Sequence, residues 1–169
     1  MYWFTSDEHY GHTNIIKYCN RPYRNVAEMD EDLIRRFNSV VNKMDVTVHA
    51  GDFAWSSKEE HVHKYYVSAL NGSHIFLKGS HDRWLKQASY LFERKIGDLY
   101  VVVCHYCLKT WPRSYQGSIC LFGHSHGRLP PETNQWDITV DNNNYFPISL
   151  DQIHDIMKMQ TRLNEYDKI

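Results

Sequence analysis

The sequence lacks several features that would assign a protein to a class at once. No apolar run approaches the roughly 18 residues that a membrane-spanning helix needs, so we predict no membrane span. An excess of one charge is also missing, since 19 basic residues stand against 20 acidic ones, whereas proteins that coat nucleic-acid duplexes are usually basic. The N-terminus has neither a basic start nor a long apolar middle, so we predict no signal peptide and expect a cytoplasmic protein.

Cysteine is sparse. The four cysteines are too few and too unevenly spaced for a disulfide framework. Cys104 and Cys107 form one CxxC pair, but structural zinc usually needs a second pair. We favour an ordinary structural role for this pair. The alternative is a redox role, since the two thiols flank His105 and a disulfide between them would distort a loop that carries a candidate ligand.

What is present fits a globular protein. The chain has 169 residues, of which 42% are hydrophobic and 23% charged, so we expect one domain over residues 1–160 and a polar C-terminal tail over 161–169. Short apolar strands alternate with amphipathic helices in the first half, and the second half is rich in strands. This order predicts an α/β fold with two packed mixed sheets flanked by helices.

The expected elements follow from periodicity and capping signals. Ser56 or Ser57 would cap the second helix, and Ser149 with Gln152 forms a capping box for the last one. The predicted helices are Glu28–Asn42, Ser57–Leu70, a short one around Arg83–Leu91 and one after Ser149. The predicted strands are Tyr2–Ser6, Val46–His49, Ile75–Leu77, Phe92–Ile96, Leu99–Cys104, Ile119–Phe122 and Ile138–Val140.

Histidine is abundant, with 11 in the chain, and several lie in acid- and histidine-bearing clusters directly after predicted strands. The carboxyl ends of strands in an α/β sheet converge on one edge, where such folds place ligands. A single cluster would carry little weight, but five in order are hard to ascribe to chance. The five clusters are Asp7–His9, Gly51-Asp52, Gly79–Asp82, His105 and Gly123–His126.

Carboxylate and imidazole groups suit manganese, iron, zinc or cobalt. The clusters hold more ligands than one ion needs, which suggests two ions roughly 3.5–4 Å apart with a bridging carboxylate, an arrangement suited to in-line displacement at phosphorus. The six candidate ligands are Asp7, His9, Asp52, His105, His124 and His126.

The ordered set resembles the calcineurin-like metallophosphoesterases, whose motifs are D-x-H, GD, GN-H-[DE], a later H and GH-x-H. The resemblance spans about Thr5–His126. It is greatest to the short members without a cap domain that occur in bacteria and phages, which often continue the first motif as H-x-G-H-x-N-I, as here at His9–Ile15. It implies a four-layer α/β/β/α sandwich and two divalent metal ions, with manganese favoured and iron, zinc, nickel or cobalt as alternatives.

The resemblance also implies residue roles. A hydroxide that bridges the two metals would attack phosphorus, and His81, oriented by Asp82, would protonate the leaving group, since an alkoxide leaves poorly. The implied ligands of the first metal are Asp7, His9, Asp52 and His126. The implied ligands of the second are Asp52, Ser80, His105 and His124.

Ser80 departs from the family pattern, which has Asn at this position. Serine is shorter and a poorer metal ligand than the asparagine carboxamide. Ser80 is either a natural adjustment of the second site or an engineered substitution that weakens activity. In both cases we expect weaker occupancy of the second site and slower turnover than in Ser80→Asn.

Candidate substrate contacts lie beside the motifs. Arg21 and Arg83 are candidate phosphate clamps, because guanidinium suits phosphate oxygens, and ordinary surface ion pairs are the alternative. His12 and Asn14 are candidates for lining the cleft. Four aromatic residues near the motifs could stack on a nucleobase or pack in the core. They are Tyr10, Trp55, Trp84 and Tyr106.

We therefore expect a binuclear-metal phosphoesterase whose partner is a phosphate-ester substrate. An open cleft favours a phosphodiesterase acting on a nucleotide-like diester or a nucleic-acid end. A small-molecule diester and a nuclease substrate both remain open. The alternatives are a phosphomonoesterase and a non-catalytic metal-binding scaffold of the same fold. No membrane partner is expected, and the oligomeric state is left open.

Overall fold

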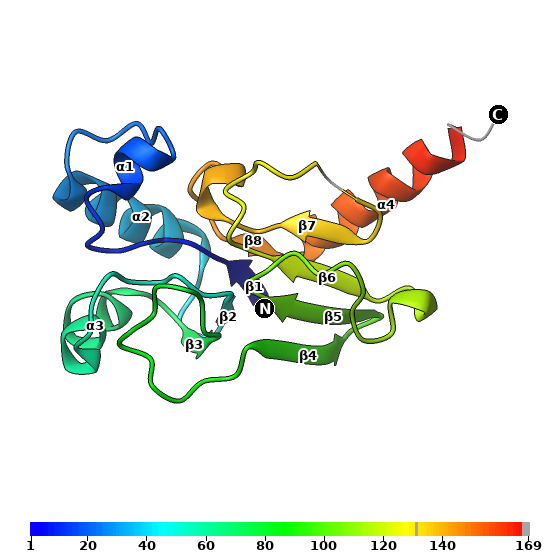
Figure 1. Ribbon diagram of the computed structural model, residues 1–169. Helices are drawn as coiled ribbons and strands as arrows, with labels where there is room; N and C mark the ends of the chain where they lie inside the picture. The colour runs from blue at the N-terminus through cyan, green and yellow to red at the C-terminus, as the bar shows by residue number, and fades with distance from the viewer. Residues whose placement is uncertain (131, 167–169) are drawn as a thin grey trace.

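A computed structural model describes residues 1–130 and 132–166. Its strands form two sheets of four, each mixed in direction, which confirms the predicted fold class (Figure 1). The first sheet has the order β3-β2-β1-β8, and its strands are Ser73–Phe76, Val46–His49, Tyr2–Thr5 and Ile148–Ser149. The second has the order β4-β5-β6-β7, and its strands are Leu91–Ile96, Leu99–Cys104, Ile119–Phe122 and Gln135–Asp137.

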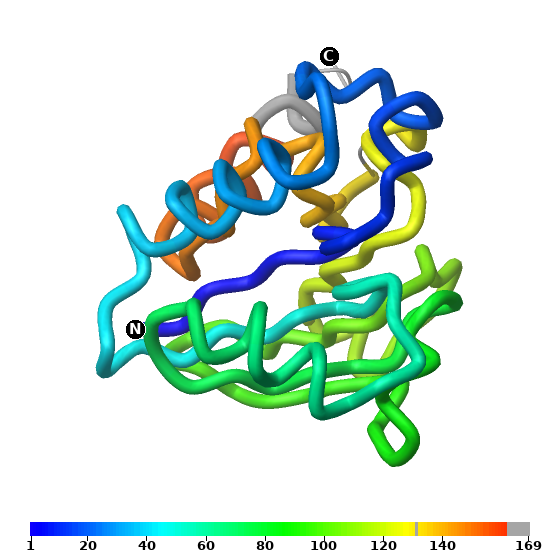
Figure 2. The backbone as a smooth tube through the Cα atoms, turned by 90° about the vertical axis from the view of Figure 1, so that its left-hand side faces the viewer, coloured from blue at the N-terminus to red at the C-terminus, as the bar shows by residue number. Residues whose placement is uncertain are grey.

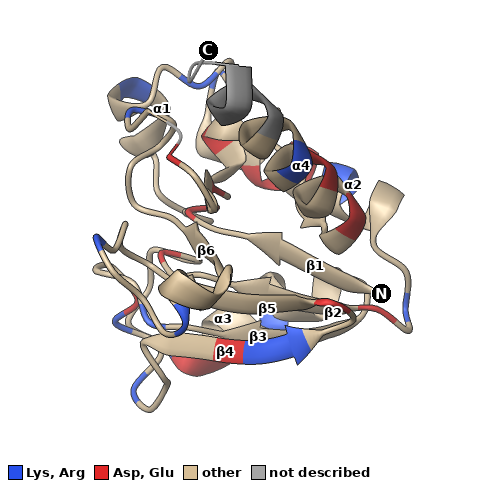
Figure 3. Ribbon diagram, turned by 90° about the vertical axis from the view of Figure 1, so that its right-hand side faces the viewer, with Lys and Arg blue, Asp and Glu red and all other residues tan. Residues whose placement is uncertain are grey.

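Strand direction matters for the site. β1, β2 and β3 run parallel to one another, and β5, β6 and β7 do the same, while β8 and β4 are antiparallel edge strands. β1 crosses the middle of the molecule (Figure 2). The edge strand β4 exposes Glu93, Arg94 and Lys95, charges that discourage pairing with another chain (Figure 3).

Two apolar clusters follow from the alternation of side chains along the strands. Phe4 and Val48 face the second sheet and pack with Val101 and Leu121, joined by Ile153 of α4. The other face of the first sheet packs against the helices at the opposite side of Figure 1 from α4. The helices are α1 (Ile15–Tyr18), α2 (Val26–Val40), α3 (Glu59–Tyr65) and α4 (Leu150–Tyr166), with single 3-10 turns η1 (Val67–Ala69), η2 (Ser114–Gln116) and η3 (Val140–Asn142).

The helix termini differ in part from the prediction. α2 begins two residues early because the Asn25 side chain accepts a hydrogen bond from the backbone N–H of Glu28. α3 has Lys58 at its N-cap position, so neither Ser56 nor Ser57 caps it as predicted. The capping box of α4 is confirmed, since Ser149 and Gln152 each bond the other's backbone N–H. α4 runs through 161–166, which we had placed in the tail, and 167–169 lie outside the described residues.

Two predicted elements are wrong. Residues 83–90 form turns and irregular backbone rather than a helix, and Leu91 already belongs to β4. Trp84 is fully buried and its indole N–H bonds Asp82, which ties the segment to the core. Residues 138–140 are not a strand of the second sheet. Thr139 instead pairs with Ser6 beside the first sheet, so this segment crosses between the two sheets. No helix among the described residues is long and apolar enough to span a membrane.

Candidate metal centre

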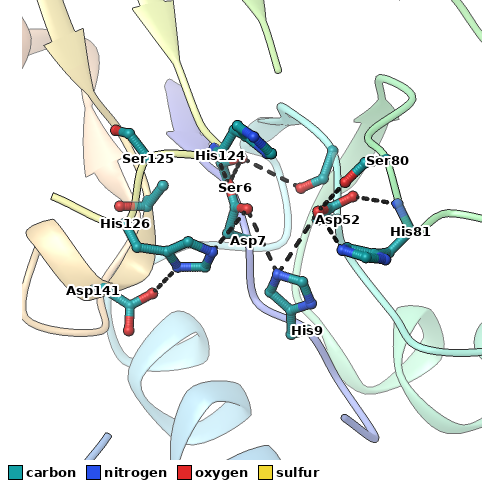
Figure 4. Close-up of polar contacts among 12 residues, drawn as sticks. Ser6, Asp7, His9, Asp52, Ser80, His81, His124, Ser125, His126 and Asp141 are labelled. Atoms are coloured by element: carbon teal, nitrogen blue, oxygen red, sulfur yellow. Dashed lines mark hydrogen bonds and ion pairs between the residues drawn. The ribbon is translucent and has the colours of Figure 1, made fainter. Parts of the chain in front are cut away.

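The structure brings the predicted clusters together at one edge of the two sheets (Figure 4). Asp7 and His9 follow β1, Asp52 follows β2, and Ser80 lies beyond β3. On the second sheet, His105 directly follows β5, and His124 and His126 follow β6. Since these strands are parallel within each sheet, their carboxyl ends carry the side chains to a common place.

Asp7, His9 and His126 form the first group of potential ligands, with one ligand atom of each within 4.8 Å of the others. Asp7 Oδ1 lies 3.6 Å from His9 Nε2 and 3.5 Å from His126 Nε2. The Asp7 and His9 side chains are almost fully buried, and His126 is partly exposed. This spacing suits one ion bound by a carboxylate and two imidazoles.

Asp52, His105 and His124 form a second group that meets the same criterion. Asp52 Oδ2 lies 3.4 Å from His105 Nε2 and 3.8 Å from His9 Nε2 of the first group. The same oxygen accepts a 2.9 Å hydrogen bond from Ser80 Oγ. Asp52 therefore stands between the two groups, where a bridging carboxylate would stand.

Three buried atoms of these groups have no hydrogen-bond partner among the described residues: Asp7 Oδ1, His9 Nε2 and His105 Nε2. A buried polar atom left unpaired costs roughly 1–3 kcal/mol, and cation coordination would satisfy all three. The donor set, carboxylate and imidazole with little thiolate, is one that divalent transition metals prefer. The residues present fit a pair of metal ions.

The backbone at the site is unusual. Asp7, His9, Asp52, His124 and His126 all have φ between 50° and 66°, in the left-handed region that residues other than glycine seldom adopt. Such conformations cost free energy and gather at functional sites, where the surrounding structure holds them.

Glycines allow the close approach of these loops. A Cβ atom at Gly79 would lie 2.3 Å from Asp52 Oδ1, and one at Gly123 would lie 2.5 Å from Asp7 Oδ2. Any side chain at either position would displace a carboxylate. Close packing therefore explains why glycine begins the Gly79–Asp82 and Gly123–His126 motifs.

Hydrogen-bond partners outside the two ligand groups orient the imidazole rings through their Nδ1 atoms. His105 Nδ1 is 3.0 Å from the carbonyl oxygen of Ala50, which can only accept, so Nδ1 carries the proton and Nε2 offers a lone pair toward Asp52. His126 Nδ1 is 2.7 Å from Asp141 Oδ2 in the same manner. His9 Nδ1 lies 3.2 Å from His12 Nδ1.

Arg21 is not the phosphate clamp that we predicted. Its side chain is fully buried and donates to both carboxylate oxygens of Asp141 at 2.8 Å. It also donates to the carbonyl oxygens of Asp7 and Glu8. With its guanidinium enclosed in this way, Arg21 positions Asp141 and the first ligand loop instead of contacting substrate.

Contrary to the prediction, no hydrogen bond among the described residues joins the Asp82 carboxylate to the His81 ring. The Asp82 carboxylate is buried and accepts hydrogen bonds from the backbone N–H groups of Asp52, Phe53 and Gly79, and from the Trp84 indole. Asp82 thus joins the loop after β2 to the loop after β3. Its influence on His81 runs through the backbone.

Charge within the centre is mutually stabilised. Burial alone would raise the pKa of Asp7, but the nearby imidazoles of His9, His105 and His126 hold it below its usual value. Burial opposes protonation of His126, yet its bond to Asp141 raises its pKa to about 10. Ionised carboxylates that lie among imidazoles form a place where divalent cations would replace protons.

Three of the four remaining candidates line the adjoining cleft, a cavity of about 470 Å³. His12 and Asn14 lie on its wall, as predicted, and His81 lies at its mouth with its side chain 42% exposed. His81 Nε2 is 3.9 Å from Asp52 Oδ2. Arg83 is exposed but borders a neighbouring cavity instead, with its guanidinium 5.8 Å from the Trp55 ring centroid.

Sequence reasoning missed two residues near the centre. Asp141 supports His126, and Arg128 lines the cleft and donates to the carbonyl oxygen of Tyr18. Neither belongs to a motif, although the position of Arg128, two residues after His126, could have marked it as a candidate substrate contact. The Asp141 contact depends on the chain crossing between the sheets at Thr139, which no local pattern reveals.

The aromatic candidates divide by burial. Tyr10 and Trp84 are core residues, while Trp55 and Tyr106 are 44% and 46% exposed. Trp55 stacks on His12, with centroids 4.2 Å apart and planes 12° from parallel. All four cysteines are free thiols in the structure.

Comparison with known proteins agrees with the fold and the motifs. The family model described as calcineurin-like phosphoesterase matches residues 2–165. An uncharacterised protein of Methanocaldococcus jannaschii is 31% identical over 155 residues, covering 88% of this chain and 86% of its own. The Gene 66 protein of Mycobacterium phage L5 is 33% identical over 81 residues, covering 47% of this chain and 39% of its own.

Among solved structures, a protein of unknown function from Aquifex aeolicus has a similar fold. Its TM-score is 0.71 at 20% identity, with 92% of this chain and 98% of the other covered. The family match and the fold together define the class. This chain belongs to the calcineurin-like phosphoesterase family, whose members bind divalent metal ions and act on phosphate esters.

Proposed function

We propose that this protein is a binuclear-metal phosphodiesterase that acts on a nucleotide-like diester or a nucleic-acid end. The observation that carries the proposal is Asp52, whose Oδ2 lies within 4 Å of imidazole nitrogens from both ligand groups. Asp7, His9 and His126 would hold one ion, His105, His124 and Ser80 the other, and Asp52 both. We favour manganese, as the donor set allows.

Two cations bound there would lower the pKa of a water molecule and neutralise charge that develops on the phosphoryl oxygens. The chain's own residues do the rest. His81 Nε2 faces the centre and would donate a proton to the leaving oxygen. Arg128, on the cleft wall, would contact a non-bridging phosphate oxygen in place of Arg21.

The shape of the surface supports a diester over a monoester. The cleft beside the metal centre and the cavity beyond it share Trp55 and His81 as lining residues. An ester with groups on both sides of phosphorus can extend over this wall, whereas a monoester would occupy one side alone.

The test compares bis(p-nitrophenyl) phosphate with p-nitrophenyl phosphate as substrates, with added Mn²⁺ and metal content measured alongside. We expect about two manganese ions per chain and faster hydrolysis of the diester. Asp52→Asn should lose both metal and activity, whereas Asp155→Asn, at an exposed aspartate of α4, should change neither.

His81 is tested separately from metal binding. His81→Asn should keep the metal content and lose about 10²–10⁴-fold in kcat, the usual contribution of a general acid. His154→Asn, at an exposed histidine of α4, is the matched control. Metal binding with no hydrolysis of either ester by the unaltered protein would favour the scaffold function instead, and a faster monoester reaction would favour a phosphomonoesterase.

A further inference from the structure

A second cavity adjoins the metal centre on the side of His81. It measures about 360 Å³, within the roughly 300–1,000 Å³ typical of ligand sites. Trp55 and His81 line both this cavity and the metal cleft, so the two are separated only by these side chains. A substrate can therefore reach from one into the other.

The lining of this cavity is basic. Lys58, His61 and Arg83 border it, along with Trp55, Ser56 and Ser57, and none of its described lining residues is acidic. Within the described part of the chain, neither the Lys58 ammonium nor the Arg83 guanidinium forms an ion pair. Two unpaired cations converging on a concave surface favour an anionic group there.

The wall between the cavities is held in place. The Trp55 indole stacks on His12, which in turn contacts His9. The Trp55 and His81 ring centroids are 5.2 Å apart, and the Arg83 guanidinium lies 5.8 Å from the Trp55 ring centroid. Arg83 therefore borders the second cavity beside Trp55 and does not line the metal cleft.

We propose that this cavity binds a second phosphate, carried by the leaving group of the substrate. The proposal rests on the proposed function and specifies its substrate class: a dinucleotide or nucleic-acid end whose departing nucleoside bears a further phosphate. In the reaction, a water molecule gives one proton to the solvent and its oxygen bonds to phosphorus. The bond from phosphorus to the departing oxygen breaks, that oxygen takes the proton of His81, and His81 regains a proton from the solvent. Because the cavity lies on the His81 side, it receives the departing half.

The test uses the dinucleotide dTpT and its two versions with a phosphate on the 5′ or the 3′ end, with Mn²⁺ present. Two versions are needed because the direction of cleavage decides which nucleoside departs. We expect one phosphorylated version to be cleaved with about tenfold higher kcat/KM than dTpT, mainly through KM, as one charge-assisted contact implies. The advantage should shrink as salt is raised.

The readout within each variant is the ratio of kcat/KM for the phosphorylated and plain dinucleotides, which cancels general losses of activity. Lys58→Gln and Arg83→Gln should bring the ratio close to one. Lys64→Gln should keep it, since Lys64 lies in the next cavity along α3 and not in this one.

The outcomes separate the two proposals. If bis(p-nitrophenyl) phosphate is hydrolysed but a terminal phosphate gives no advantage, the leaving-group site is refuted and the phosphodiesterase stands. The same holds if the advantage survives in Lys58→Gln and Arg83→Gln. If no diester is hydrolysed at all, both proposals fall together.

Discussion

At the scale of single residues, the three central acids have different tasks. Asp7 Oδ2 accepts from Ser6 Oγ at 2.5 Å and from the His124 backbone N–H at 2.8 Å, which leaves Oδ1 free toward the metal centre. Asp52 Oδ1 accepts from the His81 backbone N–H and directs Oδ2 inward. Asp82 accepts through both oxygens and directs none inward. The position of the N–H donors around each aspartate thus decides whether it is available as a candidate ligand or acts as a structural anchor.

Asp82→Asn tests this anchoring role. An amide can accept through one oxygen only and presents its own N–H groups to backbone donors, so we expect a loss of about 1–3 kcal/mol in the free energy of unfolding. Turnover should fall as well, because the loop carrying His81 loses its tie to the loop carrying Asp52. Urea denaturation and kcat would be measured together. Unchanged stability with a shifted pH–rate profile would instead support a direct effect of Asp82 on His81.

Ser80→Asn tests the departure from the family motif. The Ser80 hydroxyl already bonds Asp52 Oδ2, so the position faces the second ligand group. A longer carboxamide oxygen there should tighten the second ion and raise turnover about tenfold. Manganese titration with both proteins would check this, with Ser68→Asn, at an exposed serine of η1, as the control. Equal metal stoichiometry and equal turnover would refute the idea.

At the scale of elements, α2 and the first ligand loop are joined by one partly buried acid. Both oxygens of Asp30 in α2 lie 3.1 Å from the backbone nitrogen of Gly11, two residues after His9. Gly11 has φ of 75°, and a Cβ atom there would lie 2.9 Å from the Tyr66 hydroxyl, so the loop has little freedom. Burial raises the pKa of Asp30 to about 6, despite the opposing hydrogen bonds from Gly11 and Tyr66.

This raised pKa predicts a pH dependence of stability. The folded state holds the Asp30 proton more tightly than the unfolded state, so the Asp30 contribution is complete below about pH 4 and is lost as the pH rises through 6. We expect the loss to be on the order of 3 kcal/mol. Asp30 thus makes the unfolding free energy fall between pH 4 and 6. Asp30→Asn should remove this fall, so that the slope of unfolding free energy against pH becomes more positive when measured with chelator present.

Asp32→Asn is the matched control for that measurement, because Asp32 lies on the same helix. Its hydrogen bonds from Arg36, Arg35 and Tyr23 outweigh the effect of burial and lower its pKa. Its stabilising contribution is therefore present above the ordinary pKa of aspartate and lost at lower pH, the opposite sign. A difference slope of the same sign in both variants would contradict the assignment.

At the scale of the whole molecule, the metal centre lies where the two sheets meet. The candidate ligands follow β1, β2 and β3 of the first sheet and β5 and β6 of the second. Metal ions bound there would link the sheets at their carboxyl ends, in addition to the apolar contacts between Phe4 and the residues opposite. Binding to the native state alone stabilises it by mass action.

Metal removal should therefore lower thermal stability. At Mn²⁺ concentrations about 100 times the dissociation constant, one site contributes about 2.7 kcal/mol, which for a protein of this size corresponds to a Tm higher by about 5–10 °C. Melting curves with chelator and with Mn²⁺ would measure the shift. Asp52→Asn should abolish most of it, and a shift that persists in this variant would place the metal elsewhere.

The sequence by itself determined the elements whose signals are local. Val46–His49 and Ile119–Phe122 are strands of the predicted bounds, and the capping box of α4 forms as predicted. The motif clusters also converge as predicted, because consecutive parallel strands bring their ends together whatever the details of packing. The convergence of the six candidate ligands could therefore be anticipated from strand order, whereas their division between two ions came from the family resemblance.

Tertiary structure decided everything that depends on contacts between distant segments. Arg21 looked like a phosphate clamp, but Asp141, 120 residues away, and two loop carbonyls enclose it. Asp82 looked like a partner of the His81 ring, but its carboxylate accepts hydrogen bonds from backbone N–H groups of another loop instead. Residues 83–90 lack a helix, and Trp84 is buried in the core. Buried polar groups bond whichever donors the fold brings within reach, and no local pattern records which those are.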